Sequence, residues 1–290
     1  MQAENRASLL GVLLMVMVAL LGAIDSVLVR LVSPGVHPFI IGFTRSLFGL
    51  LLVLPWIIWQ PEVLRSHYRF RHLLRALLKL ISLILFFMAF AAAPLADVTA
   101  IAFTAPIFVT LGAWIFLAEK PQRRRVVAIL VGFAGVLIVL RPGYQSEVPV
   151  GLLLALAGAL LTAAIQLILK PMSARDSTQT LVAWNLLLTM PLAAIPAWFV
   201  WSMPSSTEWL LLAIQGMLGA LTMGMVTRAF ALAEASLLAP VDFLRLPIVA
   251  LLAYLVFNQI PGVTTLIGAV LIFVATVLMA RSAQRVRAAA

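Results

Sequence analysis

The chain contains no cysteine, and few of its residues carry a charge. The lack of cysteine excludes disulfides, thiolate catalysis and metal sites ligated by cysteine. Only 10% of the 290 residues are charged, whereas a soluble domain carries about a quarter. Too little polar sequence remains to form the surface of a soluble protein of this length. These absences favour a protein that lies within a membrane.

The motifs of common enzymes are also missing. The sequence has no glycine-rich phosphate loop, no HExxH and no GxSxG. Its three histidines, His37, His67 and His72, lie in predicted loops or at helix ends and do not cluster. We therefore expect no enzyme activity, no metal and no cofactor. The net charge of +10 does not indicate a nucleic-acid partner, because Lys and Arg in cytoplasmic loops orient membrane helices.

What the chain has instead is a series of apolar runs of about 20 residues, the length that crosses a bilayer as a helix. The mean hydropathy is +1.14. The first run lacks a basic start and a cleavage site, so we interpret it as a retained helix. An all-α integral membrane protein with ten transmembrane helices is predicted. The spans are about 9–31, 37–59, 73–93, 96–117, 125–140, 150–170, 179–201, 208–232, 236–257 and 262–280.

Landmarks in the first half of the chain recur 140 positions later. The matched pairs are Gly11 and Gly151, Arg30 and Lys170, Pro121 and Pro261, and Arg141 and Arg281. We therefore divide the chain into two five-helix repeats, residues 1–144 and 145–290. Because each half has an odd number of spans, the second half begins on the opposite side of the membrane. Such inverted repeats are typical of transporters that alternate access to a central site.

Charged loop residues predict the orientation. With a cytoplasmic N-terminus, 14 of the 20 Lys and Arg lie in inner segments, 2 in outer segments and 4 within spans. This asymmetry predicts that both termini are cytoplasmic, in a bacterial inner membrane. The basic loop 65–75 is expected to lie against anionic lipid headgroups. The inversion is supported by the loop LAEKPQRRR after span four, whose counterpart FNQIPGVTT has lost the basic run and carries Gln259 in place of Glu119.

Ionisable residues inside the spans are candidate site residues, because a charge in the bilayer is costly. Asp25 and Arg45 both lie about 10–13 Å below the outer surface at the helical rise of about 1.5 Å per residue. They can pair, either as a structural ion pair or with Arg45 facing a cavity. The 140-residue shift sets Asn185 opposite Arg45 and Gln166 close to the counterpart of Asp25. Trp184, beside Asn185, either forms a flat wall of the site or packs between helices.

The inner half of the predicted bundle holds Lys79, Arg228, Asp242 and Arg245. Asp242 and Arg245 are three residues apart, on one helical face, where a salt bridge is the alternative to a binding role. Lys79 and Arg228 either extend to the interface or face the cavity. The excess of cations favours a substrate that bears a carboxylate or a phosphate. Asp25 and Asp242 are candidates for proton coupling.

Prolines in spans four and nine predict hinges. Pro106, Pro240 and Pro247 fall within or at the start of these two spans, which are equivalent in the repeats. Proline removes a helix hydrogen bond and bends the helix, which a membrane tolerates where the helix lines a cavity. We expect Pro106 and Pro247 to let the two spans bend as one side closes, the alternative being ordinary packing kinks.

The segment ADVTAIAFTAPIFVTLGAWIFLAEKPQRRRVVAILVGFAGVLIVLRPG, at 96–143, resembles the second part of an EamA domain of the drug/metabolite transporter superfamily. SLLAPVDFLRLPIVALLAYLVFNQIPGVTTLIGAVLIFVATVLMA, at 236–280, resembles the same part of a second copy. Arg45 matches an arginine often found in span two of this family. Gln259 departs from the usual acidic residue. The resemblance implies ten helices in two inverted repeats, with alternating access to a central cavity.

The resemblance and the intramembrane charges together favour a monomeric transporter of small metabolites. Export of an amino acid is the leading hypothesis, with Arg45 attracting the carboxylate. The alternatives are uptake of a larger metabolite, such as S-adenosylmethionine, riboflavin or a nucleobase, and a channel or a passive membrane protein. Saturable counterflow distinguishes a transporter from a simple channel.

Overall fold

The computed structural model describes residues 2–116, 123–140, 149–172, 175–232, 238 and 241–287, and all regular elements in these ranges are helical. The predicted division at residues 144 and 145 lies outside them, as does the loop that carries Glu119. The elements are α1 (Gln2–Val32), α2 (Pro38–Trp59), the 3₁₀ turn η1 (Pro61–Leu64), α3 (Arg69–Ala92), α4 (Leu95–Ala102), α5 (Ala105–Phe116), α6 (Arg123–Leu140), α7 (Val150–Met172), α8 (Thr178–Phe199), α9 (Ser206–Leu232), α11 (Arg245–Phe257) and α12 (Val263–Arg287).

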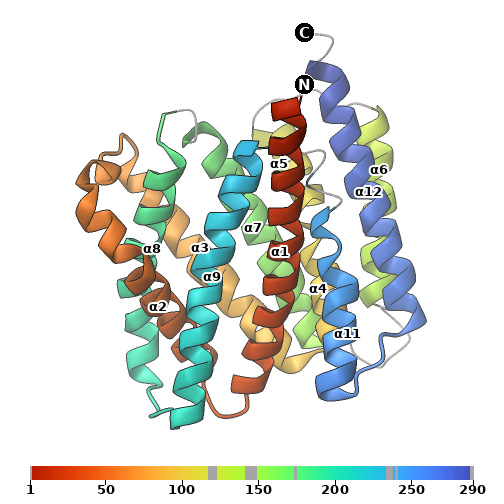
Figure 1. The fold of residues 1–290 in the computed structure, drawn as a ribbon. Coiled ribbons are helices and arrows are strands. Elements are labelled where there is room, and N and C mark those ends of the chain that lie inside the picture. Colours follow the sequence, from red (N-terminus) through yellow and green to blue (C-terminus); the bar gives the residue numbers. More distant parts are fainter. Residues whose placement is uncertain are drawn as a thin grey trace.

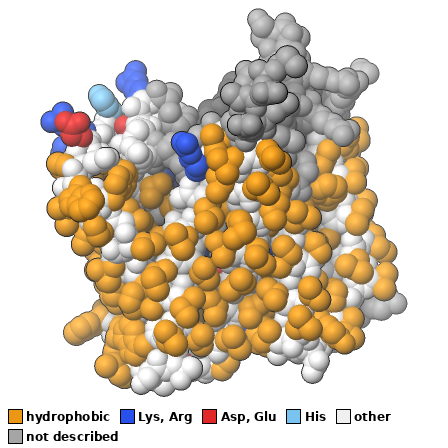
Figure 2. Space-filling view, in the orientation of Figure 1, with side chains coloured by type: hydrophobic (Ala, Val, Ile, Leu, Met, Phe, Trp, Pro, Cys, Tyr) orange, Lys and Arg blue, Asp and Glu red, His pale blue; other side chains and the backbone are white. Residues whose placement is uncertain are grey.

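These helices account for the ten predicted spans. Seven segments are long and apolar enough to cross a bilayer, and three shorter apolar helices occur within α6, α11 and α12. Figure 2 shows apolar side chains over most of the visible face, with charged side chains gathered near the upper end. In Figure 1, α1 starts at the same end of the molecule at which α12 finishes. The all-helical membrane fold is therefore as predicted.

Helix packing follows the repeat. Helix α1 packs against α9 and α11, and its counterpart α7 packs against the equivalent helices α3, α4 and α5. The pairs α2 with α8 and α6 with α12 each join a helix to its own counterpart. Each contact thus has a partner in the other half. This is the arrangement expected of two inverted repeats related by a pseudo-twofold axis.

Span four is two helices, not the single kinked helix that the sequence predicted. α4 ends at Ala102 and α5 begins at Ala105. Pro106, at the second position of α5, has no N–H to donate to the carbonyl of Ala102, so the break lies just before the proline. In span nine, α11 begins at Arg245, so the same break recurs there.

Matching hydrogen bonds mark the two breaks. The N–H of Thr104 donates to the Ile101 carbonyl at 2.9 Å, and the N–H of Leu244 donates to the Val241 carbonyl at 3.0 Å. Both donors and both acceptors are 140 positions apart. The two spans are therefore broken at equivalent residues, in the part of the fold where the sequence predicted bending.

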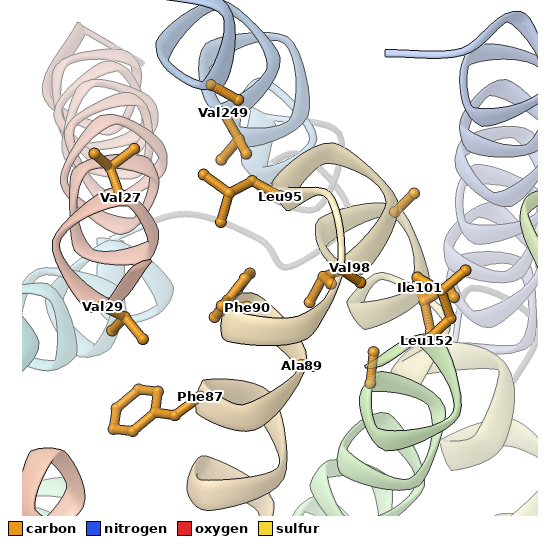
Figure 3. Packing of buried hydrophobic residues seen from close by; sticks show 14 of the residues in the cluster. Val27, Val29, Phe87, Ala89, Phe90, Leu95, Val98, Ile101, Leu152 and Val249 are labelled. Atoms are coloured by element: carbon orange, nitrogen blue, oxygen red, sulfur yellow. The ribbon is translucent and has the colours of Figure 1, made fainter. Parts of the chain in front are cut away.

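The largest apolar core lies where helices of both repeats meet. Figure 3 shows side chains of α1, α3, α4, α7 and α11 converging on it. Phe87 and Phe90 of α3 and Leu95 of α4 are buried there beside Val249 of α11. Because lipid is as apolar as these side chains, close packing holds the helices together here.

Candidate functional site

An ion pair joins α1 to α2. Nη1 of Arg45 lies 2.5 Å from Oδ1 of Asp25, and the two side chains are 20% and 13% exposed. The Arg45 guanidinium also lies over the Phe87 ring, 5.9 Å from its centroid. On its other side, Gly219 of α9 gives it room, since a Cβ at that position would lie 2.7 Å from its Nη2. The pairing predicted for Asp25 and Arg45 is confirmed.

A second arginine reaches the same turn of α1. Nη2 of Arg245, at the start of α11, donates to the Gly22 carbonyl at 3.0 Å and to the Ser26 hydroxyl at 3.3 Å. Gly22 leaves space for the guanidinium, because a Cβ there would lie 3.0 Å from its Cζ. Residues 22 to 26 of α1 therefore gather Arg45 from the first repeat and Arg245 from the second.

Asp242 does not pair with Arg245. No hydrogen bond or ion pair involving Asp242 occurs among the described residues, although the charge of Arg245 acts on its carboxylate. The salt bridge considered from their spacing of three is wrong, because the helix breaks between them and Arg245 turns towards α1. Asp242 is half-buried, and none of the residues that the structure describes pairs with it.

Lys79 is exposed on the face of α3 that points into the protein. The lipid-facing side of α3 is marked by Phe70, 76% exposed, and Met88, 39% exposed. Lys79 is nine residues from each, which is about two and a half turns and hence the opposite face. It is nevertheless exposed, and no hydrogen bond or ion pair to another described residue is formed. Lys79 therefore borders an internal space.

Gln166 of α7 lies in a similar setting. It is exposed, but it follows the exposed, lipid-facing Ala157 by nine residues, so it points to the opposite side of the helix. Helix α7 packs on α3, which carries Lys79. Both residues lie in the half of their helices nearer to the end with the termini. The two polar side chains that face the protein interior on α3 and α7 are thus nearer to that end.

The charged residues of the site lie close enough together for their charges to interact. The charges of Arg45, Arg75, Asp25 and Arg245 all act on the ammonium group of Lys79. The sequence had assigned Arg45 and Lys79 to different depths, but the structure brings both into one electrostatic cluster. Cations outnumber carboxylates in it, and among the described residues Lys79 is the member that forms no hydrogen bond or ion pair.

The opposite end is held together by two contacts between the repeats and one within the first repeat. The N–H of Leu95, at the start of α4, donates to Oε1 of Gln259 at 3.3 Å, and the Thr265 hydroxyl of α12 donates to the Asp97 carboxylate of α4. Arg30 of α1 donates to the Ala93 carbonyl at 2.5 Å. Gln259, which departs from the acidic residue usual in its family, thus caps a helix of the other repeat.

Trp184 and Asn185 do not lie together at this cluster. The Trp184 ring stacks on His72 with centroids 5.3 Å apart, and its Nε1 donates to the Leu64 carbonyl at 3.2 Å. These contacts correspond to the packing alternative for Trp184. Asn185 is buried, with 8% exposure. A substrate contact for either residue stays a prediction.

His72 belongs to a buried polar cluster that joins α3 to the segment before α8. Its Nε2 lies 2.9 Å from Oδ2 of Asp176, to which the Ser66 hydroxyl donates at 2.5 Å. Burial alone would raise the pKa of Asp176. Hydrogen bonds from Ser66, His72 and the His67 N–H outweigh it, so the pKa is lowered. Sequence reasoning missed this cluster, since its members come from the first turn of α3, the loop before it and the loop before α8, which are far apart in sequence.

Arg228 lies away from the cluster. It is exposed and follows Leu210, itself 61% exposed, by 18 residues or about five turns, so both share the lipid-facing side of α9. Because Arg228 is near the end of α9, its side chain can extend to the interface.

The prolines that predicted hinges lie at the breaks where the structure describes them. Pro106 and Pro247 lie just after the two helix breaks, and Pro240 lies outside the described residues.

Two repeats of broken and continuous membrane helices, with ionisable side chains on their protein-facing sides, form the architecture of a membrane transporter. The chain belongs to the EamA-like transporter family, whose model matches residues 9–141 and 149–281, within the drug/metabolite transporter superfamily. The two matches are offset by the 140 residues of the repeat.

Curated relatives span most of the chain. It is 30% identical over 262 residues to an S-adenosylmethionine uptake transporter of Rickettsia bellii, covering 90% of each chain. It is 33% identical over 236 residues to a riboflavin transporter of Vibrio cholerae, covering 80% of this chain and 79% of the other. A pseudopaline exporter of Pseudomonas aeruginosa is 30% identical over 275 residues, with 94% and 96% covered.

A solved crystal structure has the same fold. It superposes with a TM-score of 0.65 over 97% of this chain and 99% of the other, at 19% sequence identity. At this identity the likeness concerns the fold alone.

Proposed function

We propose that the chain carries a small metabolite with a carboxylate, an amino acid or an amino-acid derivative, across the membrane by alternating access. The observation that carries this proposal is Lys79, which is exposed on the protein-facing side of α3 and pairs with none of the residues that the structure describes. An uncompensated ammonium within a bilayer is unfavourable. A substrate carboxylate compensates it and adds a charge-assisted hydrogen bond.

Arg45 has a changed role in this proposal. Its Nη1 is engaged by Asp25, so the ion pair holds the guanidinium between α2 and α1 and leaves its other N–H groups for a ligand. Lys79 thus becomes the first contact for the carboxylate, and Arg45 a fixed second donor. Arg245 adds positive potential from the opposite repeat.

Export of an amino acid is the leading candidate function, and uptake of a larger metabolite is the second. The second is favoured by relatives named for uptake of S-adenosylmethionine and transport of riboflavin, the first by a relative named as an exporter. In either case we propose that the conformation described is the one that gives access from the end with the termini, since Lys79 and Gln166 lie nearer to that end and inter-repeat contacts lie at the other. With cytoplasmic termini it faces inward, and bending near Pro106 and Pro247 leads to the other state.

The test is flux in proteoliposomes with a panel of radiolabelled amino acids, S-adenosylmethionine and riboflavin. Lys79→Met is expected to reduce counterflow of the carboxylate-bearing substrate at least tenfold, since a charged hydrogen bond contributes about 1.5–3 kcal/mol. Lys79→Arg should retain part of it. Arg228→Gln, which removes a cation on the lipid side, is the matched control. Unchanged flux in Lys79→Met, or the absence of saturable counterflow for every compound, contradicts the proposal.

A further inference from the structure

We infer that Asp242 binds a positively charged group of the substrate, so that the cargo is zwitterionic. This inference rests on the proposed function, because it adds a second charge to a substrate whose carboxylate is bound at Lys79. The sequence had left Asp242 between a salt bridge, a role in substrate binding and a proton site. The structure removes the salt bridge.

The first argument is the missing partner. Arg245 is the nearest cation in sequence, but it donates to the Gly22 carbonyl and the Ser26 hydroxyl. Asp242 forms no hydrogen bond or ion pair with the residues described. A half-buried carboxylate within a membrane protein requires compensation. The attraction of Arg245 supplies a part of it, and a ligand cation supplies the rest.

The second argument is the position at the helix break. Asp242 directly precedes Phe243, whose ring stacks on Phe103 at 4.2 Å between centroids and meets the Phe273 ring edge at 4.9 Å. Backbone that is broken inside a membrane occurs where it lines a cavity. Aromatic faces also attract cations. Asp242 thus lies one residue along the chain from a group of three aromatic rings at the break.

The third argument is the arrangement of the two unpaired charges. Lys79 and Asp242 come from different repeats, and the charge of Arg245 acts on both. Arg245 is fixed to α1 by the Gly22 carbonyl and the Ser26 hydroxyl, and its charge repels the Lys79 ammonium group and attracts the Asp242 carboxylate. A substrate that carries one negative and one positive group satisfies both. A simple anion leaves Asp242 uncompensated.

The experiment compares each amino acid with the acid of the same skeleton that lacks the amine. The pairs are phenylalanine with 3-phenylpropanoate and methionine with 4-(methylthio)butanoate, and the readouts are thermal stabilisation of the purified protein and counterflow in proteoliposomes. In the unaltered chain the amino acid should bind about tenfold or more tightly than its partner. Asp242→Asn should abolish this preference and Asp242→Glu should retain part of it, whereas Lys79→Met should weaken both members of a pair.

The possible failures are distinguishable. If neither member of any pair nor S-adenosylmethionine binds, the proposed function fails with the inference. If both members bind equally well, and Asp242→Asn changes neither, the carboxylate proposal stands and the zwitterion inference is overturned. It is also overturned if Asp242→Asn keeps the amino-acid preference and instead loses the response to an imposed pH gradient, because Asp242 then carries a proton.

Discussion

Phe103 and Phe243 stack with their ring centroids 4.2 Å apart and their planes 20° from parallel. The two residues are 140 positions apart. Each is the first residue of the helix break in its repeat. A residue that contacts its own counterpart lies close to the pseudo-twofold axis that relates the repeats. The stack therefore marks the point where the broken spans four and nine meet.

A double-mutant cycle at this stack should show coupling. Phe103→Leu and Phe243→Leu each remove one ring, and aromatic pairs contribute about 0.5–1.5 kcal/mol beyond their burial. We expect the double variant to be less destabilised than the sum of the two single variants by about that amount. Thermal unfolding in detergent measures it. Phe108→Leu with Phe243→Leu is the control pair, and strict additivity at positions 103 and 243 would argue against an energetically relevant stack.

Because Asp25 and Arg45 form an ion pair, we expect Arg45→Ala to destabilise the fold. The sequence alone did not predict this loss of stability. The hypothesis from the sequence was that Arg45→Ala abolishes transport while the protein still folds. Because the variant leaves the Asp25 carboxylate buried without its partner, a loss of about 3–5 kcal/mol is expected. The double variant with Asp25→Asn should recover much of it. Equal melting temperatures for Arg45→Ala and the unaltered chain would contradict this account.

Two glycines of α9 should respond differently to alanine. A Cβ on Gly216 would lie 2.6 Å from the Cβ of Phe48 and 3.1 Å from the Arg45 backbone carbonyl, neither of which can move without shifting α2. Gly216→Ala should therefore destabilise by about 1–3 kcal/mol. Nothing lies within 4 Å of a Cβ on Gly224, so Gly224→Ala is neutral or stabilises slightly. Similar unfolding temperatures for the two variants would show that α2 and α9 are less closely packed.

Membrane topology is testable because the chain has no cysteine of its own. Glu62→Cys, in the turn before α3, and Ser202→Cys, in the loop after α8, are exposed at opposite ends of the bundle. With cytoplasmic termini, an impermeant maleimide added to intact cells should label Cys at 202 only. Labelling of both positions requires permeabilised cells. The reverse pattern would invert the predicted orientation.

The spans, the repeat and the family could be predicted because they depend on local hydropathy and on a constant shift along the chain. The pairing of Asp25 with Arg45 was also within reach, since both lie at one depth in consecutive helices. The contact of Arg245 with Gly22 could not be predicted, because it depends on how α11 is rotated after its break. The stacking of Trp184 on His72 could not be predicted for a similar reason, since His72 comes from the other repeat.

Asp176 is expected to make the free energy of unfolding depend on pH. Hydrogen bonds to its carboxylate lower its pKa below the ordinary 3.8, despite burial. Its contribution to stability is therefore complete above the unfolded-state value and is lost as the pH falls through the lower, folded-state value. The charged groups around the carboxylate are His72, which lies 2.9 Å away, and Arg75, whose charge is attracted by it.

Asp176→Asn should accordingly destabilise the protein at neutral pH by about 2–3 kcal/mol, through weaker hydrogen bonds with Ser66 and His72. The difference in melting temperature between the variant and the unaltered chain should stay constant from pH 7 to about pH 5 and shrink below about pH 4. Glu62→Gln, which removes an exposed carboxylate in the adjoining turn, is the control and should show no such trend. A difference that persists unchanged in acid would mean that Asp176 stabilises through packing, because the loss of its charge would then have no effect on the cluster that joins α3 to α8.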